Sequence, residues 1–253
     1  MSPSPLTLDV LRTGVAVAML GYGSARDLRT REVHDLLWIA GGGAGLVLDA
    51  ADLFLGYLTA RQLVYSVGFM AGFALVFGYL RLFGGADLLA FVALSIIHPR
   101  PPVYLQALWD WAPPFYAFTL VSNTAVAGIV TPLLVFARNL GAAVGGADLF
   151  DRHRDATPLR RAALMFTAVN IKLGDVAGPP YQYPLEEPGG EIRLRPDIWD
   201  DEKAAETFRL LREGGVKRTW VSDTLPYLVL ITAGYLLSVA FGDLLLWLFL
   251  LLL

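Results

Sequence analysis

The chain has 253 residues, of which 55% are hydrophobic and only 17% are charged, and its mean hydropathy is +0.53. Because soluble domains carry roughly a quarter charged residues, this composition predicts a membrane protein. The net charge of -3 is too small to indicate a nucleic-acid partner, and the absence of cysteine excludes disulfides, thiol catalysis and cysteine-ligated metal sites.

Apolar runs account for most of the chain. A bilayer core of about 30 Å requires roughly 20 apolar residues per helix. Runs that approach this length lie at 10–26, 36–55, 63–83, 115–137 and 225–253. One more run, 86–98, is shorter and ends in a proline-rich segment, where a helix would lose backbone hydrogen bonds. We therefore expect an all-α polytopic membrane bundle of about six transmembrane helices.

Small residues occur at helical spacing in two of these runs. The pairs Gly41/Gly45 and Gly68/Gly72 have the spacing that lets helix backbones approach closely within a membrane. Ordinary membrane-helix composition explains the same glycines, so the pattern by itself leaves both interpretations open.

One hydrophilic segment, 139–224, lies between the last two long apolar runs. Strand-forming and alternating residues predict strands at 166–173, 191–195 and 216–221. Residues 200–213 have the pattern of a helix, with acids in the first turn and two glycines after the end. We expect a small α+β lobe between the fifth and sixth helices, and it contains no phosphate-binding glycine loop.

Basic residues are distributed unevenly between the loops, and positively charged loops stay in the cytosol. With the N-terminus outside, the cytosolic side would hold Arg26, Arg29, Arg31, Arg81, Arg138, Lys217 and Arg218. The outer side would hold only Arg12, Arg61 and Arg100. We therefore expect a multi-pass plasma-membrane protein with both termini outside. The expected domains are a membrane domain over 1–138, a cytosolic lobe over 139–224 and a final transmembrane helix over 225–253.

Two aspartates lie at the expected cytosolic ends of apolar runs. Asp27 follows the first run and Asp87 opens the short run. An ionisable group at the centre of a membrane span costs about 2.5–3.5 kcal/mol, so both acids require an explanation. Counting at about 1.5 Å per residue from Arg12 and from Arg100 places the two carboxylates at similar depth, short of the inner surface.

Such a pair suits peptide hydrolysis. Two carboxylates about 4 Å apart repel each other by roughly 4 kcal/mol at an effective dielectric constant of about 20. One therefore stays protonated and polarises the scissile carbonyl, while the other activates water. Gly84 and Gly85 would allow close approach of an extended substrate. Taken singly, Asp27 is also explained as an interfacial acid balanced by neighbouring arginines, and Asp87 as an acid at a helix N-terminus.

Two other aspartates complicate this assignment. The sequence Gly-Gly-Ala-Asp-Leu of residues 84–88 recurs at 145–149 and includes Asp148. We assign catalysis to Asp87 because an apolar run follows it, whereas a highly charged segment follows Asp148. Asp243 lies inside the last apolar run, where it would pair with an arginine or mark the outer boundary of the helix.

The motifs around these aspartates resemble those of the archaeal preflagellin/prepilin peptidases, which belong to the type IV prepilin peptidase family of GxGD-class membrane aspartyl proteases. The segment Asp27–Val33 is similar to the family's Asp-x-Lys/Arg-x-Arg-x-Ile, and Gly84–Asp87 is similar to Gly-x-Gly-Asp, with alanine in the third position. Trp220–Tyr227 is similar to the archaeal Trp-Val-x-x-x-x-Pro-aromatic entry into the last helix.

The resemblance implies an aspartic-type endopeptidase with Asp27 and Asp87 as catalytic residues. It implies removal of class III signal peptides from archaellin and type IV pilin-like precursors at the cytosolic membrane edge, without a metal or other cofactor. The lipid bilayer is the other expected partner, and the oligomeric state is left open. Because such a substrate carries a basic stretch before its hydrophobic helix, Glu32 and Asp35 are candidate substrate-binding acids. Glu186 and Glu187 are further candidates, and each of the four is also explained as a solvated surface charge.

Two other classes of protein compete with this interpretation. A small proton-coupled transporter also uses intramembrane aspartates, but the chain shows no internal repeat beyond the second Gly-Gly-Ala-Asp-Leu. A membrane adaptor that binds a partner through the hydrophilic lobe would leave Asp27 and Asp87 without a role.

Overall fold

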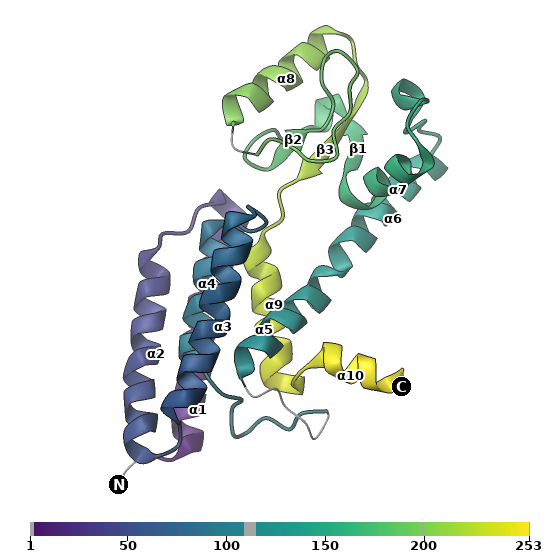
Figure 1. Ribbon diagram of the computed structural model, residues 1–253. Helices are drawn as coiled ribbons and strands as arrows, with labels where there is room; N and C mark the ends of the chain where they lie inside the picture. Colours follow the sequence, from purple (N-terminus) through teal and green to yellow (C-terminus); the bar gives the residue numbers. More distant parts are fainter. Residues whose placement is uncertain (1–2, 109–114, 199, 253) are drawn as a thin grey trace. The chain divides into compact units, whose positions relative to one another are not determined.

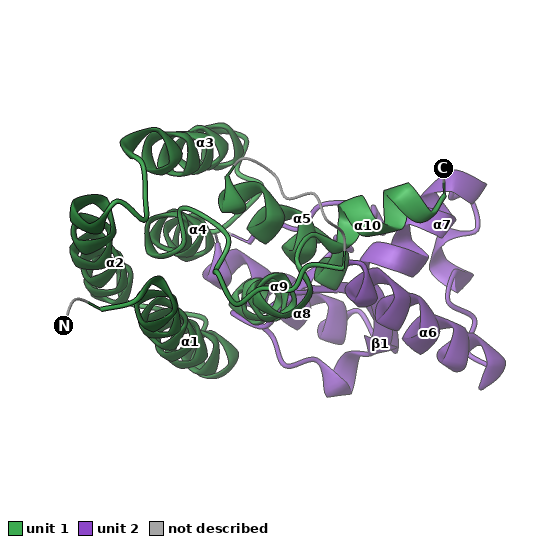
Figure 2. Cartoon of the chain, turned by 90° about the horizontal axis from the view of Figure 1, so that it is seen from below, with its two compact units in different colours: residues 1–128, 226–253 green, residues 129–225 purple. Residues whose placement is uncertain are grey.

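The computed structural model describes residues 3–108, 115–198 and 200–252, and its elements are shown along the chain in Figure 1. The chain forms two compact units, one of residues 1–128 with 226–253 and the other of residues 129–225 (Figure 2). The division into a membrane domain, a cytosolic lobe and a final transmembrane helix remains a prediction.

The first unit is a bundle of α-helices. Its elements are α1 (Pro5–Thr30), α2 (Leu36–Leu55), α3 (Ala60–Tyr79), α4 (Gly85–Ile97), α5 (Tyr116–Gly128), α9 (Tyr227–Phe241) and α10 (Leu244–Leu251). Although α4 is short, it contacts α1, α2, α3, α5 and α9, and the end-on view shows it among the other helices (Figure 2). Its side chains Phe91, Leu94 and Ile97 are buried in the main apolar core.

Local signals account for where these helices begin and end. Ser4 caps α1 by accepting a hydrogen bond from the backbone N–H of Thr7, and Pro5 occupies the first turn, where no donor is needed. Thr59 and Gln62 form a reciprocal capping box at the start of α3. Helix α2 ends at Gly56, whose φ of 77° lies in the left-handed region that glycine adopts without strain.

Three helices of the described chain are long and apolar enough to cross a membrane. They are Leu36–Leu55, Ala60–Tyr79 and the continuous Tyr116–Val144, which joins α5 to α6. The bent pair α9 and α10 would make a fourth span, with an angle of 64° between its halves. The chain is therefore mostly helical with three or four candidate spans, and the expected six spans are not confirmed.

The composition of the last apolar run predicts one continuous helix, but the structure divides this run into two. Apart from residue 253, which lies outside the described residues, it is divided at Gly242, whose φ of 79° and ψ of -148° end α9. Asp243 then caps α10 by accepting a hydrogen bond from the N–H of Leu246, and it also accepts one from Ser122. Of the two interpretations of Asp243, the pairing with an arginine is therefore wrong for the described residues.

The two glycine pairs have different environments. A Cβ atom at Gly41 would collide with Met19, and one at Gly45 would lie 3.0 Å from the Ile97 backbone, so this pair does allow close helix packing. Gly68 and Gly72 have no atom within 4 Å of such a Cβ, and ordinary composition explains them.

Gly234 permits a closer approach of two helix backbones than Gly41 or Gly45 does. A Cβ at this position would lie 2.6 Å from the backbone N and Cα of Thr124, at the contact between α9 and α5. We expect Gly234→Ala to destabilise the bundle by about 1–3 kcal/mol, because the two backbones would have to separate. Gly72→Ala, which meets open space, should be neutral or slightly stabilising. Thermal unfolding of the two variants in detergent checks this difference, and equal midpoints would contradict it.

A charged network is buried in the first unit. The guanidinium of Arg12 donates to Asp49 at 2.7 Å, to Asp52 at 3.0 Å and to the carbonyl oxygen of Ile97 at 2.7 Å. Arg100 bonds to Asp9 at 3.0 Å and to Asp52 at 3.4 Å. Arg12 is only 1% exposed and Arg100 only 9%, so both side chains are buried within the bundle, and their place on the outer side of the membrane remains a prediction. They are buried because three carboxylates compensate them.

The second unit combines helices with a three-stranded antiparallel sheet. Its elements are α6 (Val130–Val144), η1 (Asp151–His153), α7 (Pro158–Thr167), β1 (Val169–Lys172), η2 (Leu173–Asp175), β2 (Gln182–Pro184), α8 (Asp201–Glu213) and β3 (Arg218–Asp223). The strand order is β1-β3-β2, and the register pairs Val169 with Val221 and Tyr183 with Ser222. An α+β composition is therefore confirmed for this part of the chain.

Most local predictions for this unit are confirmed, with one exception. Strands β1 and β3 and helix α8 form within three residues of the predicted positions. The predicted strand at 191–195 is wrong, because only an isolated bridge joins Ile192 to Glu186 there. Trp220 lies in β3, within the predicted strand 216–221, where its ring is fully buried and its Nε1–H donates to the carbonyl oxygen of Leu149.

Candidate functional site

Asp27 lies near the carboxyl end of α1, beside the first turn of α9. Its Oδ2 accepts a hydrogen bond from the backbone N–H of Leu228 at 3.3 Å. The first N–H groups of a helix lack intrahelical partners and attract negative charge, so α9 fixes this carboxylate from a distant part of the sequence. Arg31, one turn further along, approaches the other oxygen to 3.9 Å. The side chain of Asp27 is 13% exposed, so it is reachable but not freely solvated.

Asp87 lies in the first turn of α4. Its Oδ2 accepts a hydrogen bond from the backbone N–H of Gly84 at 3.2 Å, so the carboxylate caps its own helix. Asp87 therefore does lie at a helix N-terminus, which is the structural explanation that the sequence also allowed. It does not exclude a chemical one, because a carboxylate has a second oxygen and further lone pairs.

One pocket of about 410 Å³ brings the two aspartates together. It is lined by Asp27, Arg31, Glu32, Val33, Asp35, Gly84, Gly85, Ala86, Asp87, Leu89 and Leu228. The charges of Asp27 and Asp87 are close enough to interact, and Tyr227 is within electrostatic range of Asp87. All of these residues belong to the helical unit. The pocket therefore presents two interacting carboxylates beside glycines and acidic residues.

Comparison with known proteins identifies the family. Residues 14–133, which include both aspartates, match the type IV leader peptidase family. Residues 160–244 match a second model, described as the archaeal peptidase A24 C-terminus, type II. The chain belongs to the type IV leader peptidase family. The preflagellin peptidase of Methanococcus voltae is 26% identical over 240 residues, which cover 90% of this chain and 94% of the relative.

Six of the eight site residues predicted from the sequence line the same pocket of this leader-peptidase-family chain. The further candidates Glu186 and Glu187 lie in the other unit, and Glu186, at 3% exposure, is not the solvated surface charge considered for it. Glu32 and Asp35 follow α1 and precede α2, and both are exposed, without an ion pair among the described residues. Gly84 and Gly85 form the other wall, beside Asp87. Their common location agrees with a site, but their roles in catalysis or substrate binding remain predictions.

Asp148 lies in a different unit from Asp27. Its side chain is 62% exposed, approaches Arg154 to 3.7 Å and accepts a hydrogen bond from the N–H of Phe150. The repeated sequence has opposite structural effects in its two copies, since Gly85 begins α4 whereas Gly145 ends α6. The following residues explain the difference: an apolar helix follows Asp87, and a charged segment follows Asp148.

Two residues at the start of α9 were not singled out for this site. Leu228 anchors Asp27 through its backbone N–H, which no side-chain pattern reveals. Tyr227 could have been noticed as the aromatic residue of the last family motif, and its ring lies 4.9 Å from that of Phe83. Within the part of the chain that the structure describes, no three His, Asp or Glu side chains gather as metal ligands would.

Proposed function

We propose that this chain is an aspartyl endopeptidase that removes leader peptides from archaellin-like and type IV pilin-like precursors at the cytosolic edge of the membrane. The observation that carries the proposal is that Asp27 and Asp87, from two different helices, line one pocket and interact electrostatically. Membership of a leader peptidase family supports the reaction class, and the similarity to a preflagellin peptidase supports the substrate class.

The two carboxylates divide the chemistry between them. Their mutual repulsion, together with the low dielectric of a partly buried pocket, keeps one proton on the pair. The ionised carboxylate takes a proton from water, whose oxygen attacks the scissile carbonyl carbon, and the protonated carboxyl group donates to the carbonyl oxygen. When the tetrahedral intermediate collapses, the carboxyl group that took the proton from water passes it to the leaving nitrogen, the other carboxylate recovers the proton of the intermediate's hydroxyl group, and the C–N bond breaks. The proton is assigned to the pair rather than to either residue.

The glycines give the substrate access to this pair. A Cβ at Gly84 would lie 3.1 Å from Oδ2 of Asp87, so a side chain at this position would press on the carboxylate. A Cβ at Gly85 has no atom within 4 Å, so the space beside it is open to an extended peptide backbone. We propose that the scissile bond lies against these two residues.

Cleavage of a precursor by the purified chain tests the proposal. The full-length protein in detergent should cut an archaellin precursor once, on the amino-terminal side of its hydrophobic segment, and mass spectrometry of the products locates the bond. A proton-coupled transporter or a membrane adaptor would leave the precursor intact. Absence of cleavage by folded protein would therefore overturn the proposal.

The acids of the pocket should recognise the basic stretch of the substrate. We expect charge reversal of Glu32 and Asp35 together to raise KM by at least about 5- to 30-fold, because two surface attractions of about 0.5–1 kcal/mol each are lost and like charges then repel. The value of kcat at saturating substrate should stay near wild type. Steady-state kinetics at two salt concentrations measure this, with Glu191→Lys, an exposed acid of the other unit, as control. A fall in kcat with unchanged KM would contradict this docking role.

We also propose that six helices span the membrane, with both termini outside and residues 139–224 in the cytosol. Protease added to sealed right-side-out vesicles should leave this segment intact, whereas protease added to inverted vesicles should remove it. The arginine distribution is the reason for this orientation. The opposite digestion pattern would reverse the topology.

A further inference from the structure

The second unit contains a pocket of about 570 Å³ that is lined by cations without a compensating acid. Its lining residues are Lys172, Leu173, Gly174, Arg212, Val216, Lys217 and Arg218. We call this site the basic pocket. Two of the three lysines of the whole chain line it. An anionic ligand would compensate these charges.

The sheet register brings two of these cations directly opposite each other. Lys172 on β1 pairs with Arg218 on β3, and like charges at such positions are destabilising. The guanidinium of Arg218 is fixed by Asn170, to whose side-chain oxygen Nε donates at 2.7 Å and to whose backbone oxygen Nη2 donates at 2.6 Å. A preorganised cation facing a second cation favours binding of an anion between them.

The remaining cations are available to a ligand. Lys172, Arg212 and Lys217 are exposed, and none of them makes an ion pair within the described part of the chain. They lie on three different elements or turns, namely the end of β1, the last turn of α8 and the segment before β3. Positive charges from distant positions in the sequence therefore lie together around this pocket.

The floor of the basic pocket is apolar and connects to a membrane helix. Leu173 is buried in a core with Val169, Phe208 and Val221, and Val216 and Val135 of α6 pack against this core. Helix α6 is the carboxyl-terminal half of the candidate span Tyr116–Val144. Cations next to apolar side chains, beside a candidate membrane helix, match a ligand with an anionic headgroup and an apolar body.

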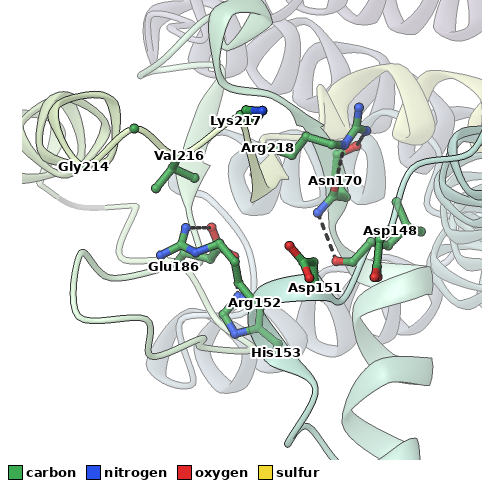
Figure 3. A pocket seen from close by; sticks show the side chains of 12 residues that line it. Asp148, Asp151, Arg152, His153, Asn170, Glu186, Gly214, Val216, Lys217 and Arg218 are labelled. Atoms are coloured by element: carbon green, nitrogen blue, oxygen red, sulfur yellow. Dashed lines mark hydrogen bonds and ion pairs between the residues drawn. The ribbon is translucent and has the colours of Figure 1, made fainter.

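The neighbouring pocket shows that the charge excess is local. This pocket, of about 510 Å³, shares Val216, Lys217 and Arg218 with the basic pocket, and its lining side chains are drawn in Figure 3. Its acids are matched: Glu186 accepts hydrogen bonds from Thr219 and Arg152 and contacts His153. Asp151 pairs with Arg154 at 3.0 Å. Apart from the shared Lys217 and Arg218, the charged side chains of this pocket therefore have partners, and the uncompensated cations are those of the basic pocket.

We propose that the basic pocket binds the phosphate of an anionic phospholipid from the membrane that holds the chain. Lys172, Arg212 and Lys217 contact the phosphate oxygens, Arg218 contributes a positioned guanidinium, and Leu173 and Val216 contact the apolar part of the lipid. Basic clusters beside membrane helices attract anionic headgroups in this way. A lipid bound there would hold the second unit at the membrane surface.

Equilibrium binding of labelled lipids to the full-length protein tests the proposal. Dansyl-labelled phosphatidylglycerol is titrated into the protein in a nonionic detergent, and energy transfer from tryptophan is recorded. Each cation contributes roughly a fivefold factor, so Lys172→Gln, Arg212→Gln and Lys217→Gln together should weaken binding about 100-fold. Labelled phosphatidylcholine, whose phosphate is already compensated, should bind wild type at least about tenfold more weakly.

Matched variants separate the pocket from bulk charge. Arg195→Gln, Lys203→Gln and Arg209→Gln together remove the same charge from exposed positions of the same unit and should leave binding within twofold. Lys172→Arg with Lys217→Arg should also bind within twofold, since it retains the charge. Equal loss in both triple variants, or unchanged binding in the pocket triple variant, overturns the proposal. Displacement of the lipid by inorganic phosphate at millimolar concentration would also overturn it, because the site would then hold free phosphate.

Discussion

Replacing either Asp27 or Asp87 with asparagine is expected to abolish cleavage of a prepilin-type substrate. The mechanism requires both a base that activates water and an acid that polarises the carbonyl, and each such role is worth about 10²–10⁴-fold in rate. Asparagine can neither take up nor release the proton. It retains an oxygen that can accept the hydrogen bond from the N–H of Leu228 or Gly84, so both variants should still fold.

Asp148→Asn is the matched control for these variants. It removes the corresponding carboxylate from the second copy of the same five-residue sequence, at an exposed position of the other unit. Cleavage of a precursor in detergent, normalised to the amount of folded protein, should stay near wild type. If Asp148→Asn were inactive and Asp87→Asn active, the assignment of the catalytic pair would be wrong.

Replacing Arg12 with glutamine is expected to cost about 3–5 kcal/mol of stability, the largest effect in the bundle away from the site. Removing one partner of a buried ion pair leaves the remaining charges uncompensated. Here the loss would affect Asp49 and Asp52, and it would also remove the donor to the carbonyl oxygen of Ile97 at the end of α4. Thermal unfolding in detergent should show a strongly lowered midpoint or loss of folded protein.

Arg61→Gln provides the comparison for this variant. Arg61 begins α3 at an exposed position, and surface substitutions usually change stability by less than about 0.5 kcal/mol. Equal midpoints for the two variants would show that the buried network does not hold α4 against α1 and α2. The network matters for the site because α4 carries Asp87 at its other end and α1 carries Asp27.

Local sequence signals determined most of the helices. The apolar run 36–55 coincides with α2 at Leu36–Leu55, and the short run at 86–98 coincides with α4 to within one residue. Helices are predictable in this way because their hydrogen bonds join residues four apart, and because composition over one turn decides whether they continue. The acidic first turn of α8 and its terminal glycines follow the same logic.

The sequence also singled out the residues of the candidate site, but their assembly depended on tertiary structure. Asp27 and Asp87 are 60 positions apart, and only the packing of α1, α4 and α9 places them in one pocket. The anchoring of Asp27 by the N–H of Leu228 depends on a backbone group, so no side-chain pattern predicts it.

The charged network was decided by tertiary structure in a different way. Asp49 and Asp52 lie inside the apolar run 36–55, but no role was predicted for them, and their partners Arg12 and Arg100 were predicted on the outer side of the membrane. Charge counts along a chain cannot distinguish an exposed arginine from one whose charge is compensated by a distant carboxylate, because that compensation requires contact in space. The sequence by itself thus determined the helices and the candidate residues, and the packing of helices decided which charges meet.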